Sequence, residues 1–483
     1  MSKSLPKQPS LEHLKNEAKA LLRQAKAGDP AALAQVGEAR LANAQLAVAR
    51  DYGFASWAKL KRAVQGYETE KAALFAAIRA GDREGVGRAL DANPSLIASY
   101  EAESFGSPPI VVAARRDDRP TIDLLLSRGA DLDARSDWWA GSFGALDLVG
   151  EETAKYLLAK GATLTAHAAA RLGMEEALRD ILAKNPEVVH ERGGDGQYPL
   201  HFAKTPEIVD IILDAGADID ARDIDHEGTA AQTLILNEPV LRRLVERGAK
   251  TDLFIAIALD VLDLVQKHLD EDPDSIGRGI DMPGNPMIPQ APGQHIYTYN
   301  LGFVRPFQAA LKLNKPRVYD DLFERSPAGL RLAAACCRGD RDAAYRILDD
   351  NPSVAAGLPE EDKVLLCYSG RTPNPDAVRL MLEVGFDPNT QDRENFTVAH
   401  WASFHGRDDL MEIILPYRPD LELRNVYGGT VLTTMMFGSR NRWYENGNYA
   451  RALELLIAAG AKLPEKLGGS EEVVEVLKRH GVP

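Results

Sequence analysis

Apolar residues recur at helical spacing along this chain, in runs that each end at a glycine or a proline. Two close copies of the glycine ending occupy residues 124–135 and 211–222, where Gly-Ala-Asp follows an apolar run and precedes alternating apolar and polar residues. Weaker copies surround Gly161, Gly248, Gly385 and Gly460. Because glycine adopts a left-handed conformation without a Cβ penalty, each copy predicts a helix end followed by an extended turn.

A second kind of ending alternates with the first and uses proline. An Asn-Pro or Asp-Pro pair follows an apolar run at Pro94, Pro186, Pro273 and Pro352. Proline has no backbone N–H to continue the helical hydrogen bonds, so these pairs also predict helix ends. Intervals that end at a glycine marker are 35, 32, 30, 32 and 33 residues for Pro94–Gly129, Gly129–Gly161, Pro186–Gly216, Gly216–Gly248 and Pro352–Gly385. Intervals that end at a proline marker are shorter, 25 residues for both Gly161–Pro186 and Gly248–Pro273. This period predicts an all-α array of helix pairs that bury their apolar faces against one another.

The start of the repeat is clearest at residues 196–203, which read Gly-Gln-Tyr-Pro-Leu-His-Phe-Ala. Similar starts lie at residues 106–114 and 397–402. A unit of about 33 residues with a Thr-Pro-Leu-His-like start resembles the ankyrin repeat, and the chain resembles a bacterial-type ankyrin repeat protein with an N-terminal helical head. The resemblance implies an ankyrin-like helical repeat solenoid of about twelve units. It also implies that His201 and His400 tie neighbouring loops together and are not catalytic.

The predicted domains are an N-terminal helical head or cap at 1–68 and a repeat solenoid at 69–483. In the head, Ser10 caps a predicted helix at 11–22, a second helical stretch covers 30–49, and a third begins near Asp51. An end cap is what an open stack of repeats needs for solubility.

Three segments break the period, near 136–147, 277–306 and 434–450, and they carry unusual aromatic residues. Insertions in repeat proteins map to loops that often line the binding face. The rings either fold back to fill gaps between degenerate repeats or line a pocket on the concave face for a sugar, a peptide side chain or another ring-bearing ligand. The candidate ligand-binding residues are Trp138, Trp139, Phe143, Tyr297, Tyr299, Arg440, Trp443 and Tyr444.

Charge and composition narrow the classes of partner. The net charge is −14, yet residues 1–66 hold 11 Lys or Arg against 5 Asp or Glu, so the remainder carries −20. An acidic body repels phosphate backbones, which disfavours nucleic acid as a partner. No apolar run is long enough to span a membrane, and the three cysteines have no disulfide or zinc-ligand spacing. These features predict a cytoplasmic monomer that binds no membrane, metal or cofactor.

The leading hypothesis for function is a protein–protein interaction scaffold that uses the concave loop face, which is what the resemblance implies. The alternative is a small-molecule or carbohydrate-binding protein, or an acid/base enzyme of hydrolase or lyase type. Its weak catalytic candidates are Asp137, Asp225 and Glu445, paired with His226 or His295. A third reading, a lipid or nucleic-acid binder acting through the basic head, has the least support. The sequence leans against an enzyme, because it contains no phosphate-binding loop, nucleophile elbow or zinc motif.

Overall fold

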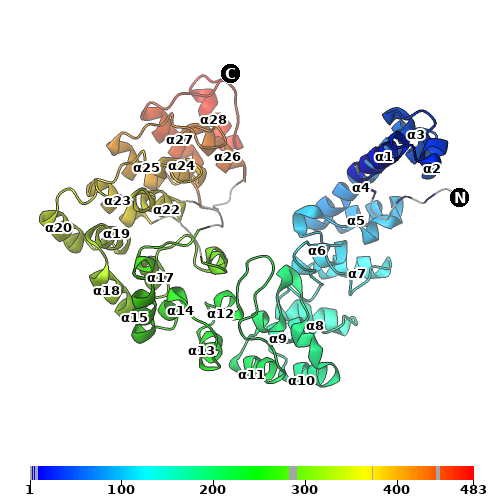
Figure 1. The fold of residues 1–483 in the computed structure, drawn as a ribbon. Helices are drawn as coiled ribbons and strands as arrows, with labels where there is room; N and C mark the ends of the chain where they lie inside the picture. Colours follow the sequence, from blue (N-terminus) through cyan, green and yellow to red (C-terminus); the bar gives the residue numbers. More distant parts are fainter. Residues whose placement is uncertain (1–2, 4, 6–8, 282–290, 373, 442–445) are drawn as a thin grey trace. The chain divides into compact units, whose positions relative to one another are not determined.

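Helices follow one another along the whole described chain, joined by turns. The computed structural model describes residues 3, 5, 9–281, 291–372, 374–441 and 446–483. Within those ranges there is no β-strand, and the only bridges are the isolated pairs Glu101–Ser107 and Arg222–Thr229. The predicted all-α helical repeat fold is therefore confirmed (Figure 1). The chain divides into two compact units, residues 1–230 and 231–483.

The first unit holds the head helices and the first helix pairs. Its α-helices are α1 (Leu11–Lys26), α2 (Pro30–Val36), α3 (Leu41–Asp51), α4 (Trp57–Ala80), α5 (Arg83–Ala92), α6 (Pro109–Arg115), α7 (Arg119–Ser127), α8 (Glu151–Ala159), α9 (Ala166–Leu172), α10 (Glu175–Lys184) and α11 (Pro206–Asp214). Its 3-10 helices are η1 (Pro94–Ala98), η2 (Ala102–Ser104), η3 (Pro186–His190), η4 (Gly194–Gly196) and η5 (Pro199–Phe202). The short α12 (Ala230–Thr233) begins at the boundary residue.

The second unit continues the pairing. Its α-helices are α13 (Glu238–Glu246), α14 (Leu253–Ala258), α15 (Leu262–Glu271), α16 (Tyr297–Asn300), α17 (Pro306–Lys312), α18 (Pro316–Arg325), α19 (Ala328–Arg338), α20 (Arg341–Asp350), α21 (Glu360–Lys363), α22 (Leu365–Arg371), α23 (Pro375–Glu383), α24 (Val398–Phe404), α25 (Asp408–Ile414), α26 (Val431–Asn441), α27 (Tyr449–Ala458) and α28 (Glu471–Arg479). Its 3-10 helices are η6 (Pro273–Ile276), η7 (Gln294–Ile296) and η8 (Leu415–Tyr417).

Both predicted kinds of helix end are present. Gly129 and Gly216 follow α7 and α11 with φ values of 85° and 96°, in the left-handed region that glycine tolerates. At the proline ending, α5 stops at Ala92, Asn93 turns the chain and its side chain caps η1, which begins at Pro94. The same geometry recurs at Asn185 before η3. The turn chemistry read from the sequence thus locates real helix ends.

The head differs from its prediction in one respect. Ser10 caps α1 as expected, its Oγ accepting a hydrogen bond from the backbone N–H of His13 at 3.3 Å. The stretch predicted as one helix over 30–49 is two helices, α2 and α3, because Gly37 takes φ 71° and ψ −107° and ends the first. The third helix, α4, is capped by Ser56 and runs on to Ala80, through residue 68.

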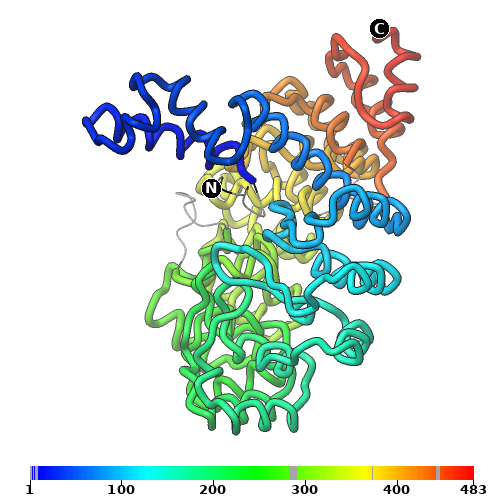
Figure 2. The backbone as a smooth tube through the Cα atoms, turned by 90° about the vertical axis from the view of Figure 1, so that its right-hand side faces the viewer, coloured from blue at the N-terminus to red at the C-terminus, as the bar shows by residue number. Residues whose placement is uncertain are grey.

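In each unit, successive helix pairs stack on one another and form the core between them. Figure 2 traces the backbone through these helices. Within the first unit the first helices α4 and α6 pack together, as do the second helices α5 and α7. One continuous cluster of buried residues runs from Tyr67 to Ala168, and Ile122, Leu125 and Leu157 are fully buried in it. Burial of each such side chain contributes about 2 kcal/mol, so neighbouring pairs supply stability that one pair lacks. Among the described residues no helix is long and apolar enough to cross a membrane.

Candidate functional site

Three consecutive repeats of the second unit present their first helices side by side. Helix α24 packs against α22 on one flank and α26 on the other. Loops at residues 391–396 and 424–429 precede α24 and α26. The carboxylate of Asp392 shapes the first loop by accepting hydrogen bonds from the backbone N–H groups of Glu394 and Phe396, both at 2.9 Å.

His400 ties these two loops together. Its Nδ1 lies 3.2 Å from the backbone N–H of Thr397, and its Nε2 lies 3.3 Å from the carbonyl oxygen of Gly429 in the next repeat. In the first unit, His201 does the same with Tyr198 and with the carbonyl of Gly228, at 3.3 and 3.1 Å. The expected structural role of both histidines is confirmed. Burial lowers the pKa of His400 to about 4, so the ring is neutral at pH 7.

A pocket of about 1080 Å³ opens over these helices and loops, and six of its lining residues are Phe, Trp or Tyr. Phe396 stacks on Trp401 with ring centroids 4.6 Å apart, and the Trp401 Nε1–H donates to Asp392 Oδ2 at 2.8 Å. Phe404 continues the row from Trp401 at 5.9 Å. These three rings are nearly buried, so they form a fixed floor. The full lining is Thr298, Gly302, Phe303, Arg371, Thr372, Glu394, Phe396, Trp401, Phe404, His405, Arg424, Asn425, Tyr427, Gly428, Gly429, Thr433, Thr434 and Phe437.

Arg371, the last residue of α22, places a cation between two of the rings. Its guanidinium carbon lies 4.1 Å from the Phe303 ring centroid and 4.8 Å from that of Trp401, which is cation–π geometry. No carboxylate among the described residues forms an ion pair with it. Its pKa is lowered mainly by burial, which the charges of Glu394 and Asp392 oppose. The pocket therefore offers a half-buried positive charge framed by aromatic faces.

Two aromatic side chains of the pocket face solvent. Tyr427 is 78% exposed and Phe437 is 56% exposed, although both line the same cavity as the buried floor. Burial of one such ring stabilises a complex by roughly 2–3 kcal/mol. Large exposed rings around a hollow are typical of a surface that a partner covers.

The predicted aromatic loop of the first unit is arranged differently. Trp138 meets Phe105 edge to face at 5.1 Å, Phe105 lies 5.6 Å from Phe143, and the Arg115 guanidinium sits over both phenylalanine rings. The Trp138 Nε1–H donates to Asp195 Oδ1 at 3.0 Å. Only 3% of Phe143 is exposed. These rings pack against one another and against a neighbouring irregular hairpin at residues 191–197.

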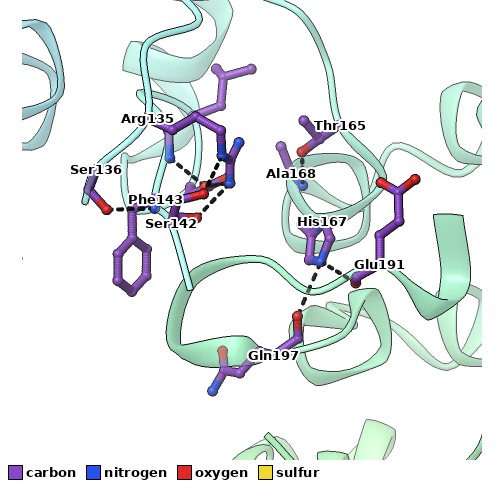
Figure 3. Close-up of polar contacts among 12 residues, drawn as sticks. Arg135, Ser136, Ser142, Phe143, Thr165, His167, Ala168, Glu191 and Gln197 are labelled. Carbon is purple, nitrogen blue, oxygen red and sulfur yellow. Dashed lines mark hydrogen bonds and ion pairs between the residues drawn. The ribbon is translucent and has the colours of Figure 1, made fainter. Parts of the chain in front are cut away.

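Hydrogen bonds fix this loop from several sides (Figure 3). The backbone N–H of Phe143 donates to Ser136 Oγ at 2.8 Å, and Arg135 Nε donates to Ser142 Oγ at 2.9 Å. His167, on α9, contacts the hairpin at residues 191–197 through its Nε2, which lies 3.1 and 3.2 Å from the carbonyl oxygens of Glu191 and Gln197. Burial lowers the pKa of His167, so the ring is neutral and joins α9 to residues 191 and 197 by hydrogen bonding.

Of the other candidates, the structure brings Asp225 and His226 together, with Oδ2 and Nε2 3.5 Å apart, and Asp195 joins them. The sequence predicted no metal site, and these three residues are a group of possible metal ligands. Asp137 is exposed, and its backbone N–H donates to the carbonyl of Gly106 at 2.8 Å. Trp139 is 68% exposed beside Trp138.

The two later insertions hold the remaining candidates. Tyr297 is fully buried against Phe254, and its hydroxyl donates to Asp252 at 2.9 Å. Tyr299 is 66% exposed, and the carbonyl of His295 accepts from Thr298 Oγ1 within the same turn. Residues 434–441 belong to α26, where Arg440 Nε donates to the carbonyl of Gly469 at 3.4 Å. Trp443, Tyr444 and Glu445 lie outside the described residues.

Sequence reasoning overlooked the pocket because it sought aromatic residues only where the period breaks. Four of the pocket rings, Phe396, Trp401, Phe404 and Tyr427, instead lie inside regular repeats. The other two, Phe303 and Phe437, lie in the segments 277–306 and 434–450 but were not among the candidates. A usable signal was present in the repeat start at 397–402, where Trp401 follows the histidine. Aromatic residues at or near the equivalent loop and first-helix positions of adjacent repeats would have indicated one shared surface.

Comparison with known proteins supports the repeat assignment. The ankyrin repeat family model matches residues 195–224. A solved structure described as the Bd0816 predatory endopeptidase from Bdellovibrio bacteriovorus in complex with immunity protein Bd3460 contains a chain that is 21% identical, covering 36% of this chain and 97% of that one. Its TM-score is 0.25, so this likeness carries no weight for fold or function. Residues 195–224 match the ankyrin repeat model, and the recurring helix pairs on either side are consistent with an ankyrin repeat protein.

Proposed function

We propose that this protein is an interaction scaffold whose second unit binds a polypeptide partner in the aromatic pocket. The observation that carries the proposal is the pairing of a rigid, buried aromatic floor with two exposed rings, Tyr427 and Phe437, on one cavity. Ankyrin repeats commonly mediate protein–protein interaction, which agrees with this use of the repeat face. An apolar side chain of the partner would enter the pocket while the exposed rings close over it.

Arg371 specifies the chemistry of that partner. A guanidinium framed by two rings and without an ion-pair partner among the described residues favours an incoming carboxylate. The charged side chains of the lining are Arg371, Arg424 and Glu394, which leaves one positive charge in excess. We therefore expect a segment that carries an aromatic or large aliphatic residue close to an aspartate or glutamate.

A selection from displayed random peptides tests the proposal, with the intact chain as bait. Selected peptides should combine a large apolar residue with a nearby acidic one. Their dissociation constants, measured by calorimetry with synthetic peptides, should rise at least tenfold for the Tyr427→Ala/Phe437→Ala double variant. Both residues are largely exposed, so the variant keeps its fold.

The matched control is Tyr345→Ala/Tyr417→Ala. These tyrosines are 42% and 39% exposed in the same unit and do not line the pocket. Peptides that bind this control as tightly as the intact chain, and the pocket variant poorly, support the proposal. Peptides that bind both variants equally, or a selection that enriches no common sequence, contradict it.

A second candidate, a small-molecule binder, draws on the size of the same cavity. Sites for small ligands commonly enclose about 300–1000 Å³ with apolar walls and a few polar groups, and this pocket measures about 1080 Å³. An anionic ring-bearing molecule would meet the same Arg371 and Trp401. A thermal-shift screen of aromatic carboxylates distinguishes this reading, because a hit should lose its effect in Arg371→Gln and keep it in Arg451→Gln.

A further inference from the structure

We propose that Asp195, Asp225 and His226 form a binding site for a first-row divalent transition-metal ion, with Zn²⁺ as the best fit. The site belongs to the first unit and goes beyond the proposed scaffold function. Each residue offers one ligand atom, and these atoms all lie within 4.8 Å of one another. Two carboxylates and one imidazole are a ligand set that zinc accepts.

The repeat itself brings the ligands together. Asp195 and Asp225 are 30 residues apart, close to one period, and sit in consecutive loops. The backbone N–H groups of Ile224 and Asp225 both donate to the carbonyl oxygen of Asp195 at 3.1 Å. These two bonds hold the loops in register, so the carboxylates face one another without help from an ion.

One separation between ligand atoms already suits a metal ion, and the others lie within 4.8 Å. His226 Nε2 and Asp225 Oδ2 are 3.5 Å apart. Two ligands that each lie about 2.1 Å from a tetrahedral ion are separated by about 3.4 Å. At 3.5 Å the pair is too long for a strong direct hydrogen bond and close to the edge of a tetrahedral site.

Asp223 orients the imidazole from behind. Its side chain is fully buried, and its Oδ1 lies 3.7 Å from His226 Nδ1 while accepting the His226 backbone N–H at 2.6 Å. This leaves Nε2 directed to Asp225. At 3.7 Å the contact with Nδ1 is too long for a hydrogen bond, so Asp223 acts on the ring through its negative charge and its bond to the backbone. The fully buried Asp223 Oδ2 has no hydrogen-bond partner among the described residues, which adds to the local negative potential.

Charge around the group favours a cation. Among the described residues, no lysine or arginine forms an ion pair with Asp195, Asp223 or Asp225. Three carboxylates around one imidazole give the group an excess of negative charge, which a divalent ion would balance.

A metal here would fasten three segments at one point. Asp195 also accepts the Trp138 Nε1–H at 3.0 Å, so an ion on Asp195 and Asp225 connects the two loops with the aromatic insertion. The ion would therefore have a structural role, stabilising this part of the first unit.

Titration of the full-length protein with ZnCl₂, followed by calorimetry, tests the site. We expect one tight equivalent, and a dissociation constant at least tenfold higher in Asp225→Asn and in His226→Gln. Asp180→Asn is the control, because Asp180 is an exposed aspartate of the same unit outside the group. CoCl₂ should give a visible absorption band typical of nitrogen and oxygen ligands in the intact chain and lose it in both ligand variants.

A second readout does not depend on the ligand variants folding. Bound Co²⁺ should quench the fluorescence of Trp138, and this part of the quenching should be absent in Trp138→Phe. Absence of a tight equivalent overturns the proposal. Zn²⁺ bound with equal affinity by the intact chain and the folded ligand variants also overturns it, because the ion would then sit on other surface histidines.

Discussion

The two units use aromatic residues in opposite ways. In the first unit, an insertion packs Trp138 and Phe143 against Phe105 and the hairpin at residues 191–197, and of the insertion's rings only Trp139 is largely exposed. In the second unit, most of the pocket rings belong to the repeats themselves, and Tyr427 and Phe437 remain exposed around a cavity. In the first unit the inserted loop folds back and covers the repeat face. In the second unit the face that carries the pocket stays open to a partner.

The polar groups follow the same division. In the first unit, Asp195, Asp225 and His226 lie together next to the aromatic insertion, and we propose that they bind a metal ion. The open pocket of the second unit instead holds Arg371 between aromatic faces. The comparison therefore assigns an architectural role to one aromatic cluster and a recognition role to the other.

Gly141→Ala gives the largest expected loss of stability and tests whether the first cluster is architectural. Gly141 has φ 152°, and a Cβ there would lie 2.0 Å from the carbonyl oxygen of Gly193. The loop must move away from the hairpin, so we expect a loss of at least about 3 kcal/mol in the free energy of unfolding. Urea denaturation measures it.

Gly129→Ala is the matched control for that substitution. Gly129 also has a positive φ, 85°, but a Cβ there meets nothing within 4 Å. Its expected loss of about 1 kcal/mol reports the backbone conformation alone. Equal losses in the two variants would show that the loop does not depend on its contact with the hairpin.

His400 predicts how the second unit responds to acid. The pKa of its ring is about 4 in the folded protein and about 6.5 in the unfolded chain, so the unfolded chain binds more protons between those values. The contribution of the neutral His400 ring to the free energy of unfolding is complete above pH 6.5, and it is lost as the pH falls towards 4. At pH 5 the loss is about 2 kcal/mol.

Urea midpoints of the intact chain and His400→Gln at pH 7.5 and pH 5 check this expectation. The variant loses the bond to the Gly429 carbonyl and is less stable at pH 7.5, but its stability should fall less between the two pH values. A parallel fall in both proteins would contradict the assignment to His400.

Trp138→Phe sharpens the comparison by removing one hydrogen bond. The ring contact with Phe105 is largely kept, while Asp195 loses the indole N–H at 3.0 Å. We expect a loss of about 1 kcal/mol in the free energy of unfolding. If a zinc ion occupies the site, the loss should shrink when ZnCl₂ is added, because the ion then holds Asp195.

Phe437→Ala should have the smallest effect on stability, below about 0.5 kcal/mol, because the side chain is 56% exposed. Peptide binding should nevertheless weaken. Thermal denaturation measures the first quantity and calorimetry the second. A clear loss of stability would mean that this ring, like Phe143, serves the fold.

The sequence predicted the fold well and the sites unevenly. Glycine and proline endings act locally, so Gly129 and Pro94 located helix ends from their neighbours alone. The break at Gly37 escaped prediction because a single glycine inside a helical pattern is often tolerated. Contacts such as Asp195 with His226 depend on how two loops one period apart come together, which spacing suggests but does not fix.

The most direct test of the comparison is hydrogen–deuterium exchange of the full chain with and without a selected peptide. The account predicts slower exchange at the loops 391–396 and 424–429 and in α24 and α26, with the loops 136–144 and 193–197 unchanged. Protection at 136–144 or 193–197, with none at the pocket loops, would contradict the account and make the aromatic insertion the recognition surface.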